Sequence, residues 1–232
     1  HYGRGTSKDL TSARAAYKKS CDNEYVFACN NLGLMLGAGE GGPEDKAEAL
    51  RMFIASCNGD NEIACDNAGG YLRDGKGAPT DLAAAYGYFT KSCDLGRMEA
   101  CYQVGYSRHY ARGAEEDLAG AFQAYKKACD GGYLYACNNL AILYQSGETV
   151  AKNEAEARRL YLLSCSADNA IACDNAGDFM KDGKGGPVDL AGAHANFVKT
   201  CDLGRLEGCY QMGYALIEGR GVAVDETAGR AA

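Results

Sequence analysis

The sequence lacks a long apolar run and a cluster of positive charge. Its uncharged stretches are short and broken by Gly or Asn, so none approaches the roughly 20 apolar residues of a membrane-spanning helix. Lys and Arg are scattered, and the formal net charge is −7, which argues against a nucleic-acid partner. A composition of 47% hydrophobic and 24% charged residues supports a packed core. We therefore expect a folded chain with no direct membrane insertion and no nucleic-acid partner.

Histidine and recognisable catalytic motifs are also scarce. The only histidines are His1, His109 and His194, and the sequence assigns no nucleophile or carboxylate partner to the last two. It contains no S-x-x-K, S-D-N or K-T-G, the motifs of serine β-lactamases and penicillin-binding proteins, and no G-x-S-x-G. Glycine-rich segments such as 74–77 and 182–185 lack a following G-K-(S/T) and fit turns better than phosphate loops. We predict no catalytic residue, no metal site and no cofactor, and the sequence leans away from an enzyme.

Cysteine, in contrast, is abundant and evenly spaced. Twelve cysteines form six pairs with seven residues between the members of each pair, and the first members recur every 36 residues. The pairs are Cys21 with Cys29, Cys57 with Cys65, Cys93 with Cys101, Cys129 with Cys137, Cys165 with Cys173 and Cys201 with Cys209. A fixed period of this size is typical of a solenoid, in which each repeat buries its apolar face against its neighbours.

The same period predicts a helix that ends at the first cysteine of each pair, which we call the second helix of a repeat. An alanine, an aromatic residue and the cysteine follow at intervals of four and so share one helix face. The aromatic residues are Tyr17, Phe53, Phe89, Tyr125, Tyr161 and Phe197. A column of helix N-cap residues precedes them. These caps are Asp9, Asp45, Asp81, Asp117, Asn153, Asp189 and Asp225.

Another helix, the first helix of a repeat, is predicted to begin just before the second cysteine. One position on its packed face is always small, and because a mid-helix glycine costs roughly 1 kcal/mol relative to alanine, this indicates close approach of a neighbouring helix. The small residues are Gly33, Gly69, Gly105, Ala141, Gly177 and Gly213. The helix is expected to stop at a left-handed residue. These stops are Gly39, Gly75, Ala111, Gly147, Gly183 and Gly219.

Each cysteine pair therefore spans the turn between two antiparallel helices, where facing side chains come close enough for a disulfide. Closing a loop of roughly eight residues stabilises the fold by about 2.5 kcal/mol in the chain-entropy model. Zinc is the main alternative, but a four-ligand site would need thiolates from two neighbouring pairs. Disulfides imply an oxidising compartment, periplasmic or secreted, with the mitochondrial intermembrane space as the alternative. No secretion signal is visible to choose among them.

The chain also contains a longer period that spans three repeats. The segment CDLGRMEACYQVGY at 93–106 matches CDLGRLEGCYQMGY at 201–214, and ACDNAGGYLRDGKG at 64–77 matches ACDNAGDFMKDGKG at 172–185. We expect a single repeat domain over 1–232. Its parts are a partial repeat at 1–20, a first three-repeat block at 21–128 and a second at 129–232.

Both ends of the chain are expected to cut through a repeat. Residues 1–10 align with a loop between helices, and residues 221–232 stop within the first turns of another second helix. Solenoids normally end in capping repeats with a polar outer face. The full protein is therefore expected to be longer than this chain.

A consensus runs through the repeats. It reads A-C-N-N-L-(G/A)-x-(M/L)-(L/Y)-x-x-G, followed by (D/N)-x-A-x-A, an aromatic residue and (S/A)-C-D-x-G. It resembles the Sel1-like repeat, an αα-hairpin relative of the tetratricopeptide repeat, and the C-x7-C pairs are similar to the cysteine-rich branch that includes the Helicobacter cysteine-rich proteins.

This resemblance covers essentially the whole chain. It implies an all-α, right-handed αα-hairpin solenoid of six repeats, each stapled by a disulfide, with about twelve to thirteen helices. It implies no single function, because the family ranges over scaffolds, assembly factors, host-interaction proteins and members that bind or hydrolyse β-lactams.

The first helix carries an amide in every repeat, on the face opposite its packed residues. The amides are Asn31, Asn67, Gln103, Asn139, Asn175 and Gln211. A row of amides lining a concave groove can pair with the backbone of an extended peptide. The alternative is that each amide bonds the backbone of a neighbouring repeat and is structural.

Tyrosines mark two candidate surface patches that are three repeats apart. The tyrosines are Tyr102, Tyr106 and Tyr110 in one patch and Tyr210 and Tyr214 in the other. Tyrosines four residues apart on a helix form a rigid amphipathic strip of the kind enriched at interfaces, the alternative being packing between repeats. The nearby Asp66 and Asp174 and the negative net charge favour a basic or extended peptide as the ligand.

Together these patterns predict a non-catalytic protein-interaction scaffold or assembly subunit that binds a protein or peptide segment along its concave groove. The partner itself, and whether the chain works within a larger complex, are left open. The alternative prediction is a β-lactam or peptidoglycan-fragment binding protein with at most weak β-lactamase activity.

Overall fold

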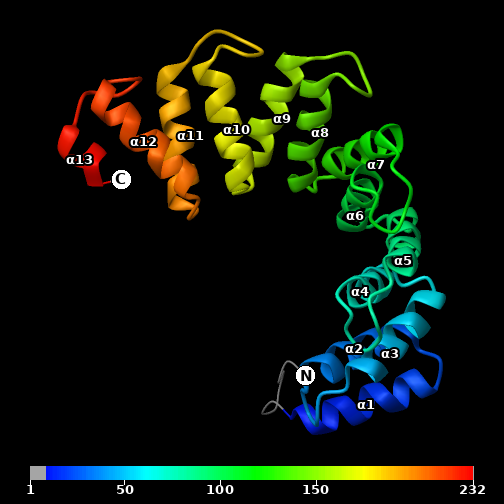
Figure 1. The fold of residues 1–232 in the computed structure, drawn as a ribbon. Helices are drawn as coiled ribbons and strands as arrows, with labels where there is room; N and C mark the ends of the chain where they lie inside the picture. The colour runs from blue at the N-terminus through cyan, green and yellow to red at the C-terminus, as the bar shows by residue number, and fades with distance from the viewer. Residues whose placement is uncertain (1–8, 232) are drawn as a thin grey trace. The chain divides into compact units, whose positions relative to one another are not determined.

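The computed structural model describes residues 9–231 and is built entirely from α-helices over that range (Figure 1). The helices are α1 (Leu10–Asp22), α2 (Val26–Ala38), α3 (Lys46–Asn58), α4 (Glu62–Arg73), α5 (Leu82–Asp94), α6 (Met98–His109), α7 (Leu118–Asp130), α8 (Tyr135–Ser146), α9 (Glu154–Ser166), α10 (Ala170–Lys181), α11 (Leu190–Asp202), α12 (Leu206–Glu218) and α13 (Glu226–Ala231). The all-α class is confirmed. The loop predicted at 1–10 falls mainly on residues 1–8, which lie outside the described range.

The chain divides into two compact units, His1–Ala124 and Tyr125–Ala232, which we call unit 1 and unit 2. The boundary falls within α7, so unit 1 contains α1 to α6 and unit 2 contains α8 to α13. This division follows spatial compactness rather than the sequence period. The predicted blocks at 1–20, 21–128 and 129–232 therefore stay a prediction.

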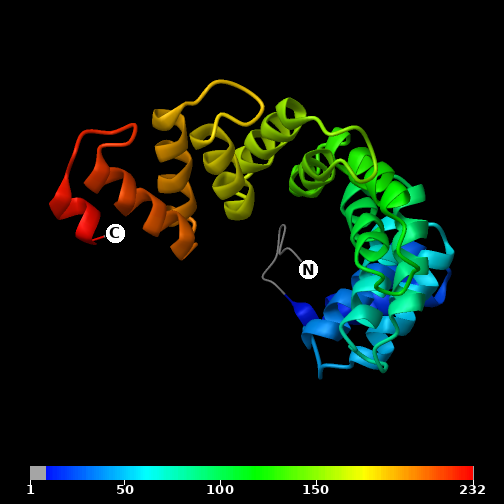
Figure 2. The ribbon, with the colours of Figure 1, turned by 45° about the horizontal axis from the view of Figure 1, so that its top comes forward.

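Within each unit, helices pack on their neighbours in chain order. In unit 1 the second helix α3 packs on the first helix α2, and α5 packs on α4; in unit 2, α9 packs on α8 and α11 on α10. Figures 1 and 2 both show α9, α10, α11 and α12 side by side, with the loops that follow α10 and α12 at the same edge. This alternation of first and second helices is the αα-hairpin solenoid that the sequence predicts.

The seven predicted N-caps all form. The side-chain oxygen of each cap accepts a hydrogen bond of 2.7 to 3.0 Å from the backbone N–H three residues further on. The capping residues are Asp9, Asp45, Asp81, Asp117, Asn153, Asp189 and Asp225. These bonds satisfy amides that the first helical turn leaves without a partner, and they fix where every second helix begins.

The small column of the first helix packs against the aromatic column of the second helix. A Cβ added to the glycine would lie 2.6 to 2.7 Å from a ring atom of the following phenylalanine, which is too close for any side chain. The pairs are Gly33 with Phe53, Gly69 with Phe89 and Gly177 with Phe197. Each of these rings is buried, so the glycines are kept by packing rather than by helix propensity.

The predicted helix stops adopt the left-handed backbone. The five glycines have φ values between 66° and 74°, and Ala111, the one exception in residue type, has a φ of 51°. Alanine is strained in this region because its Cβ approaches the following carbonyl oxygen. The backbone path is therefore kept even where the glycine is missing.

All twelve cysteines are paired as predicted. The two Cα atoms of each pair are 4.5 to 4.9 Å apart, within the range that a disulfide spans, and no cysteine in the described part of the chain is free. The bridges join Cys21 with Cys29, Cys57 with Cys65, Cys93 with Cys101, Cys129 with Cys137, Cys165 with Cys173 and Cys201 with Cys209. Each bridge joins the end of a second helix to the start of the next first helix. The zinc alternative is therefore not supported.

The second cysteine of each pair lies deep in the fold. It is buried in the first five pairs and half-buried in the sixth. The buried ones are Cys29, Cys65, Cys101, Cys137 and Cys173, and the half-buried one is Cys209. The bridges are therefore part of the core between the helices rather than part of a binding surface.

Candidate functional site

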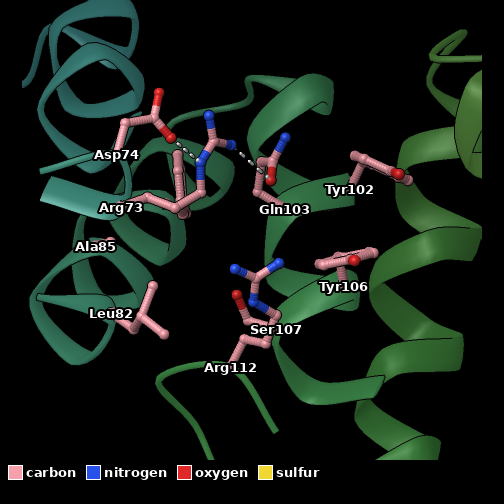
Figure 3. A pocket seen from close by; sticks show the side chains of 10 residues that line it. Arg73, Asp74, Leu82, Ala85, Tyr102, Gln103, Tyr106, Ser107 and Arg112 are labelled. Atoms are coloured by element: carbon pink, nitrogen blue, oxygen red, sulfur yellow. Dashed lines mark hydrogen bonds and ion pairs between the residues drawn. The ribbon is translucent and has the colours of Figure 1, made fainter. Parts of the chain in front are cut away.

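The candidate site of unit 1 is a cavity of about 440 Å³ between α4, α5 and α6 (Figure 3). The side chains that the site chemistry depends on come from the end of α4, from α5, from α6 and from the loop after α6. They are Arg73, Phe89, Tyr102, Gln103, Tyr106 and Arg112. Three of the predicted binding residues are thus brought together with two arginines.

The loop after α6 places Arg112 at this cavity. The next residue, Gly113, has a φ of 80°, and a Cβ there would overlap the carbonyl of Leu82. The loop can therefore lie directly on the start of α5 only because this position is glycine. Leu82 itself lines the cavity, so this close approach holds Arg112 beside the site.

Arg73 is held in place by two partners. Its Nε donates to the Asp74 carboxylate at 2.8 Å, and one terminal nitrogen donates to the side-chain oxygen of Gln103 at 3.3 Å (Figure 3). Its guanidinium carbon lies 5.9 Å from the centre of the Phe89 ring. The hydrogen bond from Arg73 lowers the pKa of Asp74, which also accepts a bond of 3.0 Å from Lys76. The acid therefore stays ionised and orients the guanidinium across the cavity.

The tyrosine strip of α6 forms one wall. The ring centres of Tyr102 and Tyr106 are 6.3 Å apart, both rings are half-buried, and the Arg112 guanidinium lies 5.8 Å from the Tyr106 ring. The ring centre of Tyr110 lies 4.6 Å from that of Tyr106 and 4.3 Å from that of His109, on which it stacks. Tyr110 does not line the cavity. Of the predicted patch, Tyr102 and Tyr106 belong to the site and Tyr110 lies next to it.

A second cavity of about 280 Å³ adjoins the first. The two cavities share Arg73, Asp74, Phe89 and Gln103, and the second also includes Asn67 of the predicted amide column. Two amides of that column therefore lie on one hollowed surface. The surface runs from α4 to α6 along the first helices.

Unit 2 contains a smaller cavity of about 100 Å³ at the equivalent position. Most of its lining residues occupy the same positions in their repeats as lining residues of unit 1, three repeats further along the sequence. The equivalent pairs are Arg73 and Lys181, Phe89 and Phe197, Gln103 and Gln211, Tyr106 and Tyr214, and Arg112 and Arg220. Tyr210, the counterpart of Tyr102, does not line it and is 67% exposed.

The amide column contributes to contacts between repeats as well. The side-chain nitrogen of Asn67 donates to the side-chain oxygen of Asn30 at 3.0 Å, and Asn175 donates to Asn138 at 3.1 Å. Each bond joins two successive first helices. The predicted structural alternative is thus present for these two amides, although the acceptor is a side chain rather than the backbone.

The remaining amides differ in their surroundings. Gln103 and Gln211 line the two equivalent cavities, and Gln103 accepts a bond from Arg73. Asn139 accepts a bond of 3.3 Å from its neighbour Asn138 and is half-buried, as is Asn31. The column is therefore not a uniform ladder: its two glutamines face cavities, whereas two of its asparagines join helices.

Both acids expected to attract a basic ligand are already paired. Asp66 accepts from Arg97 at 2.8 Å and Asp174 accepts from Arg205 at 3.2 Å. Burial raises the pKa of Asp174, and the bond from Arg205 opposes that rise. These carboxylates are neutralised within the fold, so they give no support to the expectation of a basic ligand.

The comparison with protein families decides the identity of the repeat. The Sel1 repeat family matches the chain at residues 1–25, 26–61, 63–96, 99–133, 134–169 and 206–231. The chain belongs to the Sel1 repeat family. None of the curated proteins compared matches it.

Two solved structures share the fold of this chain, and a third is similar to it in sequence. A protective antigen of uropathogenic Escherichia coli that displays this fold matches with a TM-score of 0.91 and 25% identity over 97% of this chain and 48% of that one. A Sel1 repeat protein from Oxalobacter formigenes matches with a TM-score of 0.81 and 17% identity, over 97% of this chain and 95% of its own. Cysteine rich protein B of Helicobacter pylori is 28% identical over 60% of this chain and its full length, with a TM-score of 0.47. The present chain spans about half the length of the Escherichia coli protein.

Membership of the family gives a general statement about function. Sel1-repeat proteins are generally protein-interaction scaffolds. The six disulfides indicate an oxidising compartment. Over residues 9–231, no helix is long and apolar enough to cross a membrane, and no three His, Cys, Asp or Glu side chains are grouped to hold a metal ion.

The sequence interpretation missed the two arginines of the unit 1 cavity. A signal for Arg112 was present, because the residue after each helix stop recurs every three repeats rather than every one. That column reads Glu40, Lys76, Arg112, Glu148, Lys184 and Arg220. Arg73 had no such signal, since its column reads Gly37, Arg73, His109, Gln145, Lys181 and Ile217.

Proposed function

We propose that this Sel1-repeat chain is a non-catalytic scaffold or assembly subunit that holds an extended segment of a partner protein against its first helices. One observation carries the proposal: Tyr102, Gln103 and Tyr106, each predicted to bind a partner, line one cavity of about 440 Å³. The adjoining cavity extends this surface toward Asn67. A surface that crosses two repeats suits an extended segment, because such a segment spans several shallow hollows.

The second tyrosine patch supports the same function in unit 2. Gln211 and Tyr214 line the smaller cavity, and Tyr210 presents an exposed ring on the same helix, α12. Exposed tyrosines are enriched at interfaces because they supply contact area at low entropic cost. We include Asn31, Asn139 and Asn175 in the same binding face on the basis of the sequence column alone.

For the compartment, we propose that the chain is periplasmic or secreted, with the mitochondrial intermembrane space as the alternative. The support is the number of disulfides, six in one chain, and the pairing of every cysteine in the described residues. Such pairing persists where thiols are not kept reduced. Expression of the same chain in a reducing and in an oxidising compartment, followed by thiol labelling, tests this: we expect soluble, unlabelled protein only from the oxidising one.

Peptide display combined with photo-crosslinking tests the scaffold function. Random dodecapeptides are selected on the pure chain, and the enriched peptides are then exposed to variants carrying benzoylphenylalanine at Tyr102 or at Ala55. Ala55 is an exposed position on α3, a second helix of the same unit. We expect crosslinks at position 102 and none at position 55. Failure to enrich any peptide, or crosslinks at 55 alone, would contradict the proposal.

The alternative function is a β-lactam or peptidoglycan-fragment binder. The unit 1 cavity favours it in one respect, because about 440 Å³ lies within the range of roughly 300 to 1,000 Å³ that is usual for small-molecule sites. The test is turnover of a chromogenic cephalosporin by the pure chain. Turnover that Tyr106→Ala abolishes would replace the scaffold by a hydrolase, and we expect none.

A further inference from the structure

The larger cavity of unit 1 is positive although the chain as a whole is negative, whereas the adjoining cavity, with Arg73 and Lys76 against Asp66, Asp74 and Glu99, has a net charge of −1. The lining of the larger cavity contains Arg73 and Arg112 and one carboxylate, Asp74, which gives two positive charges minus one, a net charge of +1. The equivalent lining in unit 2 contains Lys181 and Arg220 and no carboxylate. The chain carries a net charge of −7. The lining of each of these two equivalent cavities is therefore positive, opposite in sign to the net charge of the chain.

The hydrogen-bonding capacity left in the unit 1 cavity consists mainly of donors. Arg73 uses its Nε and one terminal nitrogen for Asp74 and Gln103, which leaves its other terminal nitrogen available. Because the Gln103 oxygen already accepts from Arg73, the amide nitrogen of Gln103 remains as a donor. The Arg112 guanidinium has no ion pair or hydrogen bond within the described residues and lies beside the Tyr106 ring. A group that accepts several hydrogen bonds would complete this set.

Three aromatic rings form part of the cavity wall. Phe89 is buried and Tyr102 and Tyr106 are half-buried, so the space between the two guanidiniums is bordered by rings. Rings suit the methylene groups of a carboxylate side chain, and a partly buried position strengthens its attraction to arginine. A net lining charge of +1 matches one negative charge better than the two of a phosphate group.

We propose that the unit 1 cavity binds a single carboxylate of the partner segment, between Arg73 and Arg112, and that the unit 2 cavity binds a second carboxylate more weakly. This inference rests on the proposed scaffold function and specifies the chemistry of the segment it holds. The carboxylate is an Asp or Glu side chain or the carboxyl terminus of the segment. The ligand is therefore acidic, and the basic ligand expected from Asp66 and Asp174 is replaced.

Peptide pairs test the proposal directly. The probe is the tightest peptide from the display selection, measured by fluorescence anisotropy alongside versions with each Asp or Glu changed to the amide, with the carboxyl terminus amidated, and with phosphoserine in place of the acid. We expect one acid or the free terminus to be required, with its amide version binding roughly tenfold more weakly. Equal binding of acid and amide versions, or tighter binding of phosphoserine, would overturn the carboxylate assignment.

Matched variants locate the effect. Arg73→Gln with Arg112→Gln should weaken the acidic peptide roughly tenfold and leave its amide version unchanged, so that the preference for the acid disappears. Arg51→Gln is the control, because Arg51 is an exposed arginine of α3 in the same unit, is paired with Glu48 and does not line the cavity. It should retain both affinities. Circular dichroism melting confirms that each variant is folded, and a surviving preference for the acid in the double variant would refute the site.

The two proposals fail in different ways. If peptides bind and crosslink at position 102 but tolerate every amide substitution, the scaffold function stands and the carboxylate site is wrong. If no peptide is enriched, both are wrong. Loss of the acid preference in the arginine variants with crosslinking retained would support both.

Discussion

The cavities of unit 1 and unit 2 occupy equivalent positions three repeats apart, yet they differ about fourfold in volume, about 440 Å³ against about 100 Å³. Arg112 lies 5.8 Å from the Tyr106 ring, whereas Arg220 lies 4.8 Å from the Tyr214 ring and donates to its hydroxyl at 3.3 Å. Arg220 thus lies closer to its tyrosine than Arg112 does. The two linings also differ at other positions: Tyr102 lines the unit 1 cavity and its counterpart Tyr210 does not line that of unit 2, whereas His194 lines only the latter.

The contacts that hold the repeats together are, in contrast, duplicated between the two units. Three bonds between successive repeats of unit 1 recur in unit 2, and all six distances lie between 2.8 and 3.2 Å. They are Lys91 to Asp60 and Lys199 to Asp168, Arg97 to Asp66 and Arg205 to Asp174, and Asn67 to Asn30 and Asn175 to Asn138. These contacts between repeats, which we call the frame together with the helix caps, the Gly and Phe pairs and the disulfides, are therefore alike in the two units, whereas the residues that line the two cavities differ.

The largest expected effect comes from removing the disulfide beside the larger cavity. Cys93→Ala with Cys101→Ala should lower the free energy of unfolding by about 2.5 kcal/mol, the chain-entropy value for a loop of this length. It should also abolish peptide binding in unit 1, because this bridge joins α5 to α6, which both line the cavity. Urea titrations followed by circular dichroism, together with anisotropy, measure both effects.

The matched control is Cys21→Ala with Cys29→Ala, which unlinks α1 from α2 in the same unit. Neither helix contributes to the cavity lining. We expect a similar loss of stability with binding retained. Equal loss of binding in both variants would mean that unit 1 unfolds as one cooperative block and that the cavity is not locally controlled.

The next largest effect on binding is expected at the position that is Arg73 at the end of α4 and Lys181 at the end of α10. Arg73→Lys keeps the charge but removes the planar donor that reaches Gln103, so the affinity for the acidic peptide should fall by about 1 to 2 kcal/mol. Lys181→Arg should strengthen the weaker site in unit 2. Titration calorimetry measures the affinity of both variants for the acidic peptide. If Arg73→Lys binds as the parent does, charge alone determines the affinity and the geometry at Gln103 is irrelevant.

A third difference lies at one position of α5 and α11: Tyr86 is outside the lining of the unit 1 cavity, whereas its counterpart His194 lines the unit 2 cavity. Arg108 donates to the Tyr86 hydroxyl at 2.9 Å in unit 1, whereas the equivalent positions in unit 2 are Leu216 and His194. The His194 Nδ1 is buried and has no hydrogen-bond partner within the described residues. Tyr86→Phe should therefore cost about 1 kcal/mol of stability, while His194→Leu should cost nothing or stabilise. Thermal melts compare the two, and a destabilised His194→Leu would show that the imidazole has a structural role.

The sequence predicts the frame well because the frame is periodic. The helix caps and the cysteine pairs recur in every repeat, and the Gly and Phe pairs recur three times, so each column is supported by several independent occurrences. The position of Ala111 illustrates this: its left-handed conformation follows from five glycines in the same column, not from its own residue type.

The cavities are less predictable because few of their residues recur in every repeat. Tyr102 and Tyr106 stand out through the period of three repeats, but Arg73 shares its column with five other residue types. Its place in the cavity depends on Asp74 and on Gln103 of the next repeat, a contact between residues 30 positions apart. A column shows which residues share a face, but it does not show which partner from another repeat orients them.

The smallest expected effect tests the one helix stop at which the two units differ in residue type. Ala111 has a φ of 51° in unit 1, and its counterpart Gly219 has a φ of 66° in unit 2. Ala111→Gly relieves strain of about 1 kcal/mol, and the greater freedom of glycine in the unfolded chain offsets roughly half of it, so stability should rise by about 0.5 kcal/mol. Gly219→Ala should lower stability by a similar amount, as urea titrations can measure. A loss of stability in Ala111→Gly would mean that the alanine methyl makes a stabilising contact that outweighs its strain. In that event the alanine would help to hold the loop that places Arg112 at the cavity, and the loops after α6 and α12 would not be equivalent.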